Sequence, residues 1–292
     1  MSKILKIGLP KGSLQESTFR IFRKAGFKID VGSRSYIPYI DDKDLDPMLI
    51  RAQEMSRYVE DGSLDCGITG GDWVRENHSD VNVVTELEYA KQSLNKVRWV
   101  VAVPQDSKIK SVKDLQGVRI ATELVGVTKA YLKKQGVKAD VEFSWGATEV
   151  KVAAGLVDAI VEITETGSSL RANKLRIVET ICYSTTQLIA NKTALKDAWK
   201  REKIEAIAML LKGAIIAESK VGLKMNVAQD DLEKILGLLP AMKKPTIAPL
   251  SQKGWLDVDT IIEEDEVKRL IPALKAAGAQ GIIEYPLNKV ID

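Results

Sequence analysis

Cysteine, histidine and aromatic residues are scarce in this sequence. Its 292 residues include 2 cysteines, Cys66 and Cys182, and 1 histidine, His78. A disulfide framework and a zinc cluster are therefore not expected, because too few sulfur and imidazole groups are available. A Ser-His or Cys-His nucleophile would need His78 as its base, and His78 lies in a polar segment that reads as a solvated loop.

Long apolar runs and a strong excess of one charge are also missing. No stretch approaches the roughly 18 to 20 apolar residues of a membrane span. The first residues enter a strand pattern without the apolar stretch of a signal peptide, so we expect a cytoplasmic protein with no membrane partner. The 43 basic and 40 acidic residues nearly cancel and only 5% of residues are aromatic, which argues against a nucleic-acid partner.

Strand and helix patterns alternate through the first two thirds of the chain. Ile4–Leu9 reads as a buried strand, followed by a turn and a helix with Ser13 as its N-cap. A helix over about Asp46–Glu60 precedes the strand Leu64–Thr69, and Asp72 caps the next helix. This repetition predicts parallel α/β sheets.

A second α/β unit begins near Val97, and strands expected within Arg176–Asn191 run back toward the first unit. The simplest organisation is a discontinuous domain, residues 1–95 and 181–219, that holds an inserted one, residues 96–180. A ligand site would lie in the cleft between them, at the C-terminal ends of strands.

The order of elements changes after a long amphipathic helix over about Ala194–Ser219. From Val221 on, the patterns predict a strand, a helix, two strands, a helix and a last strand at Gly281–Tyr285. This βαββαβ order is the ferredoxin-like arrangement of small ligand-sensing domains. Residues 220–292 are therefore expected to form a separate C-terminal domain.

The segment Glu149–Leu170 is the most informative about chemistry. An apolar strand ends there in Glu162 and Glu165, whose carboxylates could hold ribose hydroxyls or a magnesium-bound diphosphate. A loop opening a helix follows, formed by Thr166, Gly167, Ser168 and Ser169. Its hydroxyl and backbone N–H groups would cradle a phosphate, and the glycine lets the backbone approach closely. The alternative is a surface turn with a serine cap.

The run Glu149–Leu170 also resembles the signature of the ATP phosphoribosyltransferases, which begin histidine biosynthesis. Further segments similar to this family are Pro10–Leu14, Asp61–Gly70 and Leu239–Leu250, the last typical of its long form with a regulatory domain.

Three positions depart from the family pattern. Glu162 stands where aspartate is usual and Ser169 where threonine is usual, and Glu123–Gly126 replaces a Tyr-Pro-containing segment. Glu162 and Ser169 keep the functional group of the usual residue but alter its reach. The resemblance does not specify the contacts of Glu123–Gly126.

The resemblance implies a fold and a reaction. The fold would be a two-lobed α/β core like the type II periplasmic binding proteins, plus the ferredoxin-like regulatory domain. In the reaction, N1 of the adenine of ATP attacks C1 of phosphoribosyl pyrophosphate, and magnesium pyrophosphate leaves. Because adenine N1 already offers a lone pair, no Ser, Cys or His nucleophile is required. The family further implies Mg²⁺, inhibition by histidine, and homo-oligomers, namely dimers and hexamers.

Residue roles follow from the same resemblance. The predicted catalytic residues are Lys11, Arg51 and Glu162, with Arg51 reaching a substrate anion from the neighbouring helix. The predicted substrate contacts are Gly12, Ser13, Thr69, Gly70, Asp72, Glu149, Glu165, Thr166, Gly167, Ser168 and Ser169, and the predicted histidine contacts are Thr246 and Gly281.

Plainer alternatives exist for several of these residues, and for the function. Taken singly, Lys11 could be a solvated lysine in a turn and Arg51 an ordinary charge on a helix surface. Asp72 could be a helix cap, and Thr246 an ordinary strand residue. A non-catalytic two-lobed protein that binds a small anion has the same architecture, although such proteins normally carry an export signal. A transcription-factor effector domain has it too, but no helix-turn-helix segment is evident.

Overall fold

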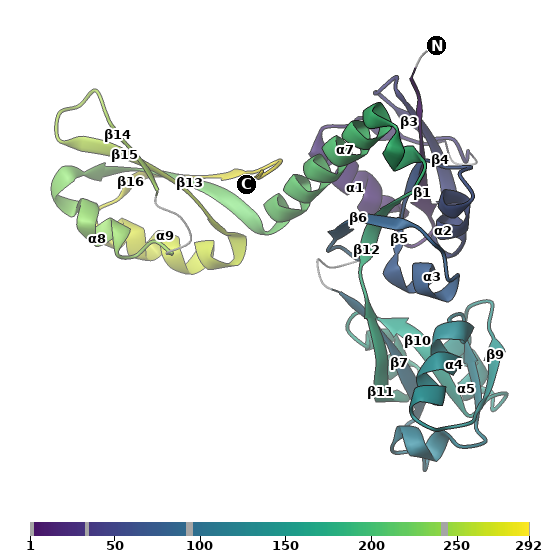
Figure 1. Cartoon of the computed structure of the whole chain (residues 1–292). Helices are drawn as coiled ribbons and strands as arrows, with labels where there is room; N and C mark the ends of the chain where they lie inside the picture. Colours follow the sequence, from purple (N-terminus) through teal and green to yellow (C-terminus); the bar gives the residue numbers. More distant parts are fainter. Residues whose placement is uncertain (1–2, 33–34, 92–95, 241–244, 292) are drawn as a thin grey trace. The chain divides into compact units, whose positions relative to one another are not determined.

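The computed structural model describes residues 3–32, 35–91, 96–240 and 245–291. Packing divides the chain into two units, Met1–Arg23 with Phe27–Ala208, and Lys24–Gly26 with Met209–Asp292. The first unit contains two five-stranded sheets and the second a four-stranded sheet (Figure 1). The predicted boundary after residue 95 and residues 241–244 of the family-like C-terminal segment lie outside the described residues. None of the described helices combines the length and apolar character needed to cross a membrane.

The first sheet has the strand order β4-β1-β5-β12-β6. Its strands are β1 (Leu5–Lys11), β4 (Leu45–Arg51), β5 (Cys66–Gly70), β6 (Asn82–Leu87) and β12 (Thr186–Ala190). The helices α1 (Gln15–Ala25), α2 (Ala52–Glu60) and α3 (Gly71–Glu76) follow β1, β4 and β5, and a small pair is formed by β2 (Ile29–Asp30) and β3 (Tyr39–Ile40). Because β4, β1 and β5 are parallel, they all end at the same edge of the sheet.

Three local predictions for this sheet were wrong. The first part of the expected helix Asp46–Glu60 is strand β4, whose side chains alternate between buried and exposed, and the helix begins only at Ala52. Strand β6 had not been predicted. Ser13 and Asp72, which were expected to be helix N-caps, do not cap their helices. Helix α1 begins at Gln15, two residues after Ser13, and the N-cap of α3 is Gly70.

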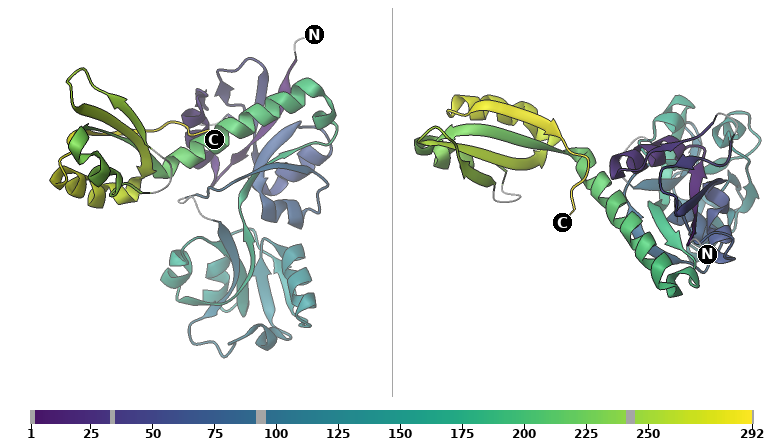
Figure 2. Two further views of the ribbon diagram at one scale, coloured as in Figure 1. Left: turned by 60° about the vertical axis from the view of Figure 1, so that its left-hand side comes forward. Right: turned by 90° about the horizontal axis from the view of Figure 1, so that it is seen from above.

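The second sheet has the order β11-β7-β10-β8-β9. Its strands are β7 (Val97–Pro104), β8 (Arg119–Thr122), β9 (Asp140–Phe143), β10 (Ala159–Thr164) and β11 (Leu175–Ser184), and its helices are α4 (Val125–Lys134), α5 (Thr148–Ala153) and α6 (Ser168–Ala172), with a 3-10 turn at Val112–Leu115. Buried clusters around Val101 and around Ile160 fill its two sides. Only Thr185 separates β11 from β12, so the chain passes directly from the second sheet to the first (Figure 2).

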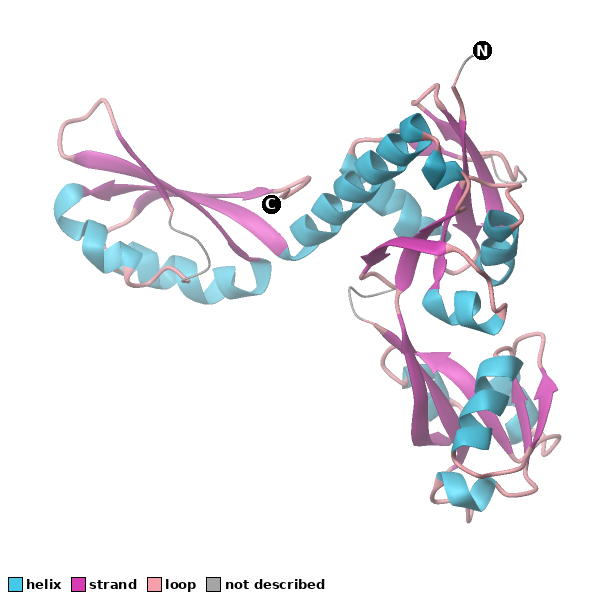
Figure 3. Cartoon of the chain, viewed as in Figure 1, coloured by secondary structure: helices cyan, strands magenta, loops and turns pink. Residues whose placement is uncertain are grey.

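The second unit has the predicted βαββαβ order. Its elements are β13 (Lys220–Ala228), α8 (Leu232–Leu236), β14 (Thr246–Pro249), β15 (Trp255–Glu263), α9 (Val267–Ala276) and β16 (Gln280–Pro286), with 3-10 turns at Gln229–Asp231 and Glu264–Glu266. Both helices lie on one face of the sheet β14-β15-β13-β16 (Figure 3). Helix α7 (Ala198–Ile216), flanked by 3-10 turns at Ala194–Lys196 and Ala217–Ser219, begins in the first unit and ends in the second. The predicted fold class is confirmed.

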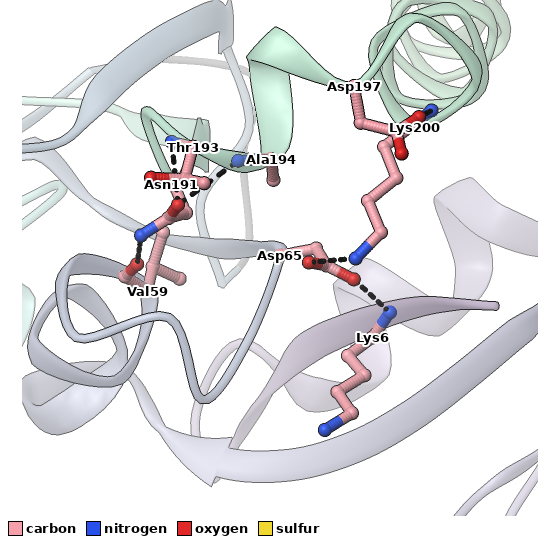
Figure 4. Close-up of polar contacts among 8 residues, drawn as sticks. All are labelled: Lys6, Val59, Asp65, Asn191, Thr193, Ala194, Asp197 and Lys200. Atoms are coloured by element: carbon pink, nitrogen blue, oxygen red, sulfur yellow. Dashed lines mark hydrogen bonds and ion pairs between the residues drawn. The ribbon is translucent and has the colours of Figure 1, made fainter.

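Asp65 connects several elements of the first unit at the edge of the sheet away from the ends of β1 and β4. Its carboxylate accepts the backbone N–H of Lys6 at 2.9 Å and the ammonium of Lys200, on α7, at 2.7 Å (Figure 4). Its backbone carbonyl accepts the N–H of Asn191, just after β12. Only 8% of Asp65 is exposed, so these contacts are shielded from water.

We expect Asp65→Ala to lower the free energy of unfolding by about 2–3 kcal/mol, because it removes a shielded ion pair and leaves a backbone N–H without its acceptor. Asp80→Ala is the matched control: it removes the pair with Lys192, in which the Asp80 side chain is 73% exposed, and should change stability little. Urea unfolding of the two variants measures the difference. Equal losses would contradict the importance given to Asp65.

Candidate active site

A cavity of about 770 Å³ in the first unit is lined by residues from both of its sheets. The first sheet contributes the ends of β1, β4 and β5, and the second contributes the end of β10 with the loop after it. The predicted site residues that line this cavity are Lys11, Gly12, Ser13, Arg51, Gly70, Asp72, Glu162, Glu165, Thr166, Ser168 and Ser169.

Three predicted substrate contacts are not among the lining residues. Thr69 is fully buried, and its hydroxyl donates to the carbonyl of Ala52 at 2.7 Å. Glu149 is half-buried on α5, and Gly167 is a buried residue of the loop. The predicted histidine contacts, Thr246 and Gly281, belong to β14 and β16 of the second unit.

Lys11 and Arg51 are neighbours at the edge where the parallel strands end. They are the last residues of β1 and β4 and are paired in register. The prediction that Arg51 belongs to a helix was wrong, because α2 begins one residue later. Gly12 then turns the chain with a φ of +104°, a conformation that favours glycine. Two cations thus converge where parallel α/β sheets bind ligands.

The loop after β10 is fixed by its own hydrogen bonds. The N–H of Gly167 donates to the hydroxyl of Thr164 at 2.7 Å, and Arg171 Nη1 donates to the carbonyl of Thr166 at 3.0 Å. The hydroxyl of Thr166 donates to that of Ser168 at 3.1 Å. Gly167 has a φ of +73°, which a β-branched residue adopts only with strain. The loop therefore holds its hydroxyl groups in a defined arrangement beside the cavity.

Glu162 is the carboxyl group with the most perturbed environment in this cavity. Burial raises its pKa from 4.5 to about 7, and the charges of Glu123 and Glu149 act in the same direction. Hydrogen bonds from the Ile163 N–H, at 3.1 Å, and from the Thr148 hydroxyl oppose the rise. Such a group is poised to change its protonation state near neutral pH, as functional carboxyl groups often are.

Asp72 joins the two sheets at the base of the cavity. Its carboxylate accepts the indole N–H of Trp99, on β7, at 2.6 Å and the backbone N–H of Trp73 at 3.0 Å. Its own N–H donates to the hydroxyl of Ser184, and the rings of Trp73 and Trp99 meet edge-on with centroids 5.9 Å apart. Asp72 is only 2% exposed, so it packs as a buried acceptor, and its predicted contact with substrate stays a prediction.

The segment that departs from the family pattern makes a second connection between the sheets. Glu76, the last residue of α3, accepts the N–H groups of Gly126 and Val127 at 2.7 and 2.9 Å. Gln53 donates to the carboxylate of Glu123 at 3.3 Å. The Glu76 carboxylate therefore connects the first turn of α4 to the first sheet. It lies at the N-terminus of α4, where the helix dipole favours negative charge.

Several lining residues had escaped the sequence analysis. They are chiefly Tyr36, Tyr89, Trp99, Thr185 and Thr186. The hydroxyls of Tyr89 and Thr18 are hydrogen-bonded at 2.7 Å, and Thr186 donates to the carbonyl of Tyr89 at 2.7 Å. No local motif marks these residues. Tyr89, Thr185 and Thr186 come together through the pairing of β6 with β12, whereas Tyr36 is anchored on β4 and Trp99 lies on β7 of the second sheet.

Comparison with known proteins identifies relatives over the whole chain. A family model described as ATP phosphoribosyltransferase matches residues 51–213, and one described as HisG, C-terminal domain, matches residues 217–289. ATP phosphoribosyltransferase of Thermodesulfovibrio yellowstonii is 60% identical over 289 residues, with 99% of each chain covered. That of Solibacter usitatus is 60% identical over 288 residues with the same coverage.

A solved structure is similar to the larger part of the chain. The ATP phosphoribosyl transferase (HisG:HisZ) complex from Thermotoga maritima matches with a TM-score of 0.61 and 29% sequence identity. The match covers 72% of this chain and 97% of that chain.

We expect Glu162→Gln to stabilise the protein at pH 8 but hardly at pH 4.5. The raised pKa means that the folded chain binds one more proton than the unfolded chain between about pH 4.5 and 7, so wild-type stability falls as pH rises through this window. Glutamine cannot ionise and avoids the loss. Urea midpoints at the two pH values measure the effect, with the exposed Glu142→Gln as control. If the urea midpoints of wild type and Glu162→Gln differed by the same amount at both pH values, the raised pKa of Glu162 would be contradicted.

Proposed function

The chain belongs to the ATP phosphoribosyltransferase family, and from that premise we propose how its cavity carries out the transfer. The enzyme is a pentosyltransferase of histidine biosynthesis that acts on ATP and phosphoribosyl pyrophosphate. A non-catalytic anion-binding protein is not favoured, because relatives named as the transferase match over the full chain.

The proposal is carried by one observation: the cationic side chains of Lys11 and Arg51, from the first sheet, line the same cavity as Glu162 and the hydroxyl-bearing loop Thr166–Ser169, from the second. We assign the pyrophosphate of the substrate to Lys11 and Arg51, with the turn Gly12–Ser13 beside them. The loop Thr166–Ser169 takes the 5-phosphate, and Glu162 takes the ribose hydroxyls between the two anions. The substrate is thereby held at both ends, with C1 open to attack.

The chemistry then depends on alignment and charge. The lone pair of adenine N1 forms the bond to C1 while the bond from C1 to the pyrophosphate oxygen breaks, and that electron pair leaves with pyrophosphate. Lys11 and Arg51 stabilise the negative charge that grows on the leaving group. Holding both substrates in one cavity supplies the alignment, so the protein needs no nucleophile of its own.

Magnesium would enter this site together with the substrate. The described part of the chain contains no group of three or more histidine, cysteine or acidic side chains able to hold a metal ion. Mg²⁺ is commonly held by one or two carboxylates together with substrate phosphates, and Glu162 and Glu123 line the cavity where such a carboxylate is needed. When bound, the ion would neutralise charge on the diphosphate.

We expect Gly167→Val to abolish pyrophosphate release from ATP plus phosphoribosyl pyrophosphate. Valine is strained at the positive φ of Gly167, and its Cβ would lie 3.0 Å from Arg171 Nη1, which donates to the carbonyl of Thr166, so the substitution disturbs the loop. Gly117→Val is a matched control, since Gly117 has a φ of +74° but no atom within 4 Å of an added Cβ and no place in the cavity. Retained turnover in Gly167→Val, or equal loss in both variants, would contradict the loop assignment.

We further propose that the second unit binds histidine, on the sheet face not covered by its helices. Asp257 Oδ1 is buried and has no hydrogen-bond partner among the described residues, while Oδ2 pairs with Lys224 at 2.9 Å. Thr246 is the register partner of Asp259, whose carboxylate accepts the hydroxyl of Tyr285 at 2.8 Å. An unpaired buried carboxylate oxygen favours a cationic ligand such as the ammonium group of an amino acid.

The oligomeric states implied by the family, dimers and hexamers, and the cytoplasmic location stay predictions. Inhibition from a separate unit requires that histidine bind one global state of the enzyme more tightly than another.

We expect Thr246→Arg to retain turnover but lose inhibition by histidine, because a long cation would occupy the face that holds Asp257 and Asp259. Ser251→Arg, in the exposed turn after β14, introduces the same side chain away from this face and should stay inhibited. Turnover at increasing histidine concentration compares the two variants. Inhibition of Thr246→Arg at the wild-type concentration would show that the site is elsewhere.

A further inference from the structure

Lys11 and Arg51 carry like charges on neighbouring backbone positions. They are register partners at the ends of adjacent parallel strands, and both line the cavity. Lysine carries its charge on a flexible four-carbon stem, whereas the guanidinium of arginine is planar and rigid. Without a further contact, the Lys11 ammonium would turn away from Arg51 toward water.

The ring of Tyr36 provides such a contact. The Lys11 ammonium lies 3.4 Å from the centroid of this ring, well within the range of a cation–π interaction. Tyr36 lines the cavity and is 60% exposed, so its ring is not part of a hydrophobic core.

The backbone around Tyr36 is held against the same strand that ends in Arg51. The carbonyl of Tyr36 accepts the N–H of Leu49, on β4, at 2.8 Å. The hydroxyl of Ser35 donates to the carbonyl of Ile37 at 2.9 Å and accepts the N–H of Ile37 at 3.1 Å. The ring is therefore presented from a closed turn anchored on β4.

We propose that Tyr36 is a positioning residue for the reaction: its ring holds the Lys11 ammonium in the cavity, at the place where the substrate diphosphate arrives. The inference rests on the proposed role of Lys11. A ring suits this purpose better than a carboxylate, because an acidic partner would neutralise Lys11 and compete with the incoming phosphate. The ring quadrupole attracts the cation but leaves its positive charge available to an anion.

A double-mutant cycle tests the proposal. Tyr36→Leu should lower kcat/KM for phosphoribosyl pyrophosphate about three- to tenfold, the range of a partly exposed cation–π contact. The loss should appear in kcat as well as in KM, since Lys11 meets the diphosphate in the ground state and stabilises its growing charge in the transition state. Tyr36→Phe keeps the ring and should restore most of the loss. In a Lys11→Met background, Tyr36→Leu should have no further effect, because the two residues act through one contact.

Tyr39→Leu is the matched control, since Tyr39 is a nearby tyrosine, 65% exposed, that does not line the cavity. Its kinetics should equal those of wild type. Two outcomes would refute the positioning role of Tyr36 while the role of Lys11 stands. In the first, Lys11→Met lowers kcat/KM but Tyr36→Leu does not. In the second, Tyr36→Leu lowers kcat/KM by the same factor with and without Lys11. If Lys11→Met itself leaves kcat/KM unchanged, the proposed function of Lys11 fails and this inference with it.

A second readout does not depend on turnover. In the wild-type protein the ring current of Tyr36 should shift the Lys11 side-chain methylene protons upfield in NMR spectra. Tyr36→Leu should abolish this shift and Tyr36→Phe should keep it. Equal shifts in all three proteins would show that the ammonium does not lie over the ring, which overturns the proposal.

Discussion

The buried Asp72 carboxylate connects the two sheets of the first unit through its hydrogen bonds. Asp72 follows β5, which belongs to the sheet that carries Lys11 and Arg51. Its partner Trp99 lies on β7, which pairs directly with the strand that carries Glu162. A carboxylate whose hydrogen bonds are satisfied in a buried site favours a unique arrangement, because losing a donor such as the Trp99 indole would leave a buried acceptor without a partner. Lys11, Arg51 and Glu162 thus line one cavity although they come from different sheets.

Most of the fold could be predicted because its signals are local: apolar periodicity, glycine at helix ends, and a change of element order after α7. The strand conformation of the segment Asp46–Arg51 could not be predicted, since its Leu, Met, Ile and Arg residues also suit a helix and run without a break into α2. Its strand conformation depends on pairing with β1, which is a long-range contact. Pro47 does not distinguish the two, because proline suits the first turn of a helix as well as an edge strand such as β4.

The candidate site likewise has a part that could be predicted from local sequence and a part that depends on long-range contacts. The loop Thr166–Ser169 could be identified because its hydroxyls and glycine are contiguous, and the structure puts that loop beside the cavity. The bond of Asp72 to Trp99 joins residues 27 positions apart, and no spacing rule connects them. Tyr36 carries no motif of its own, and its position over Lys11 follows from how the turn before β3 is anchored on β4.

The central claim is that one cavity holds phosphoribosyl pyrophosphate from two sides. A crystal structure with this substrate and Mg²⁺ bound tests it most directly. The account predicts the diphosphate within hydrogen-bond distance of Lys11 and Arg51, and the 5-phosphate within that distance of the loop Thr166–Ser169. A substrate that contacts only one of the two sheets, or that lies in the reverse orientation, would contradict it.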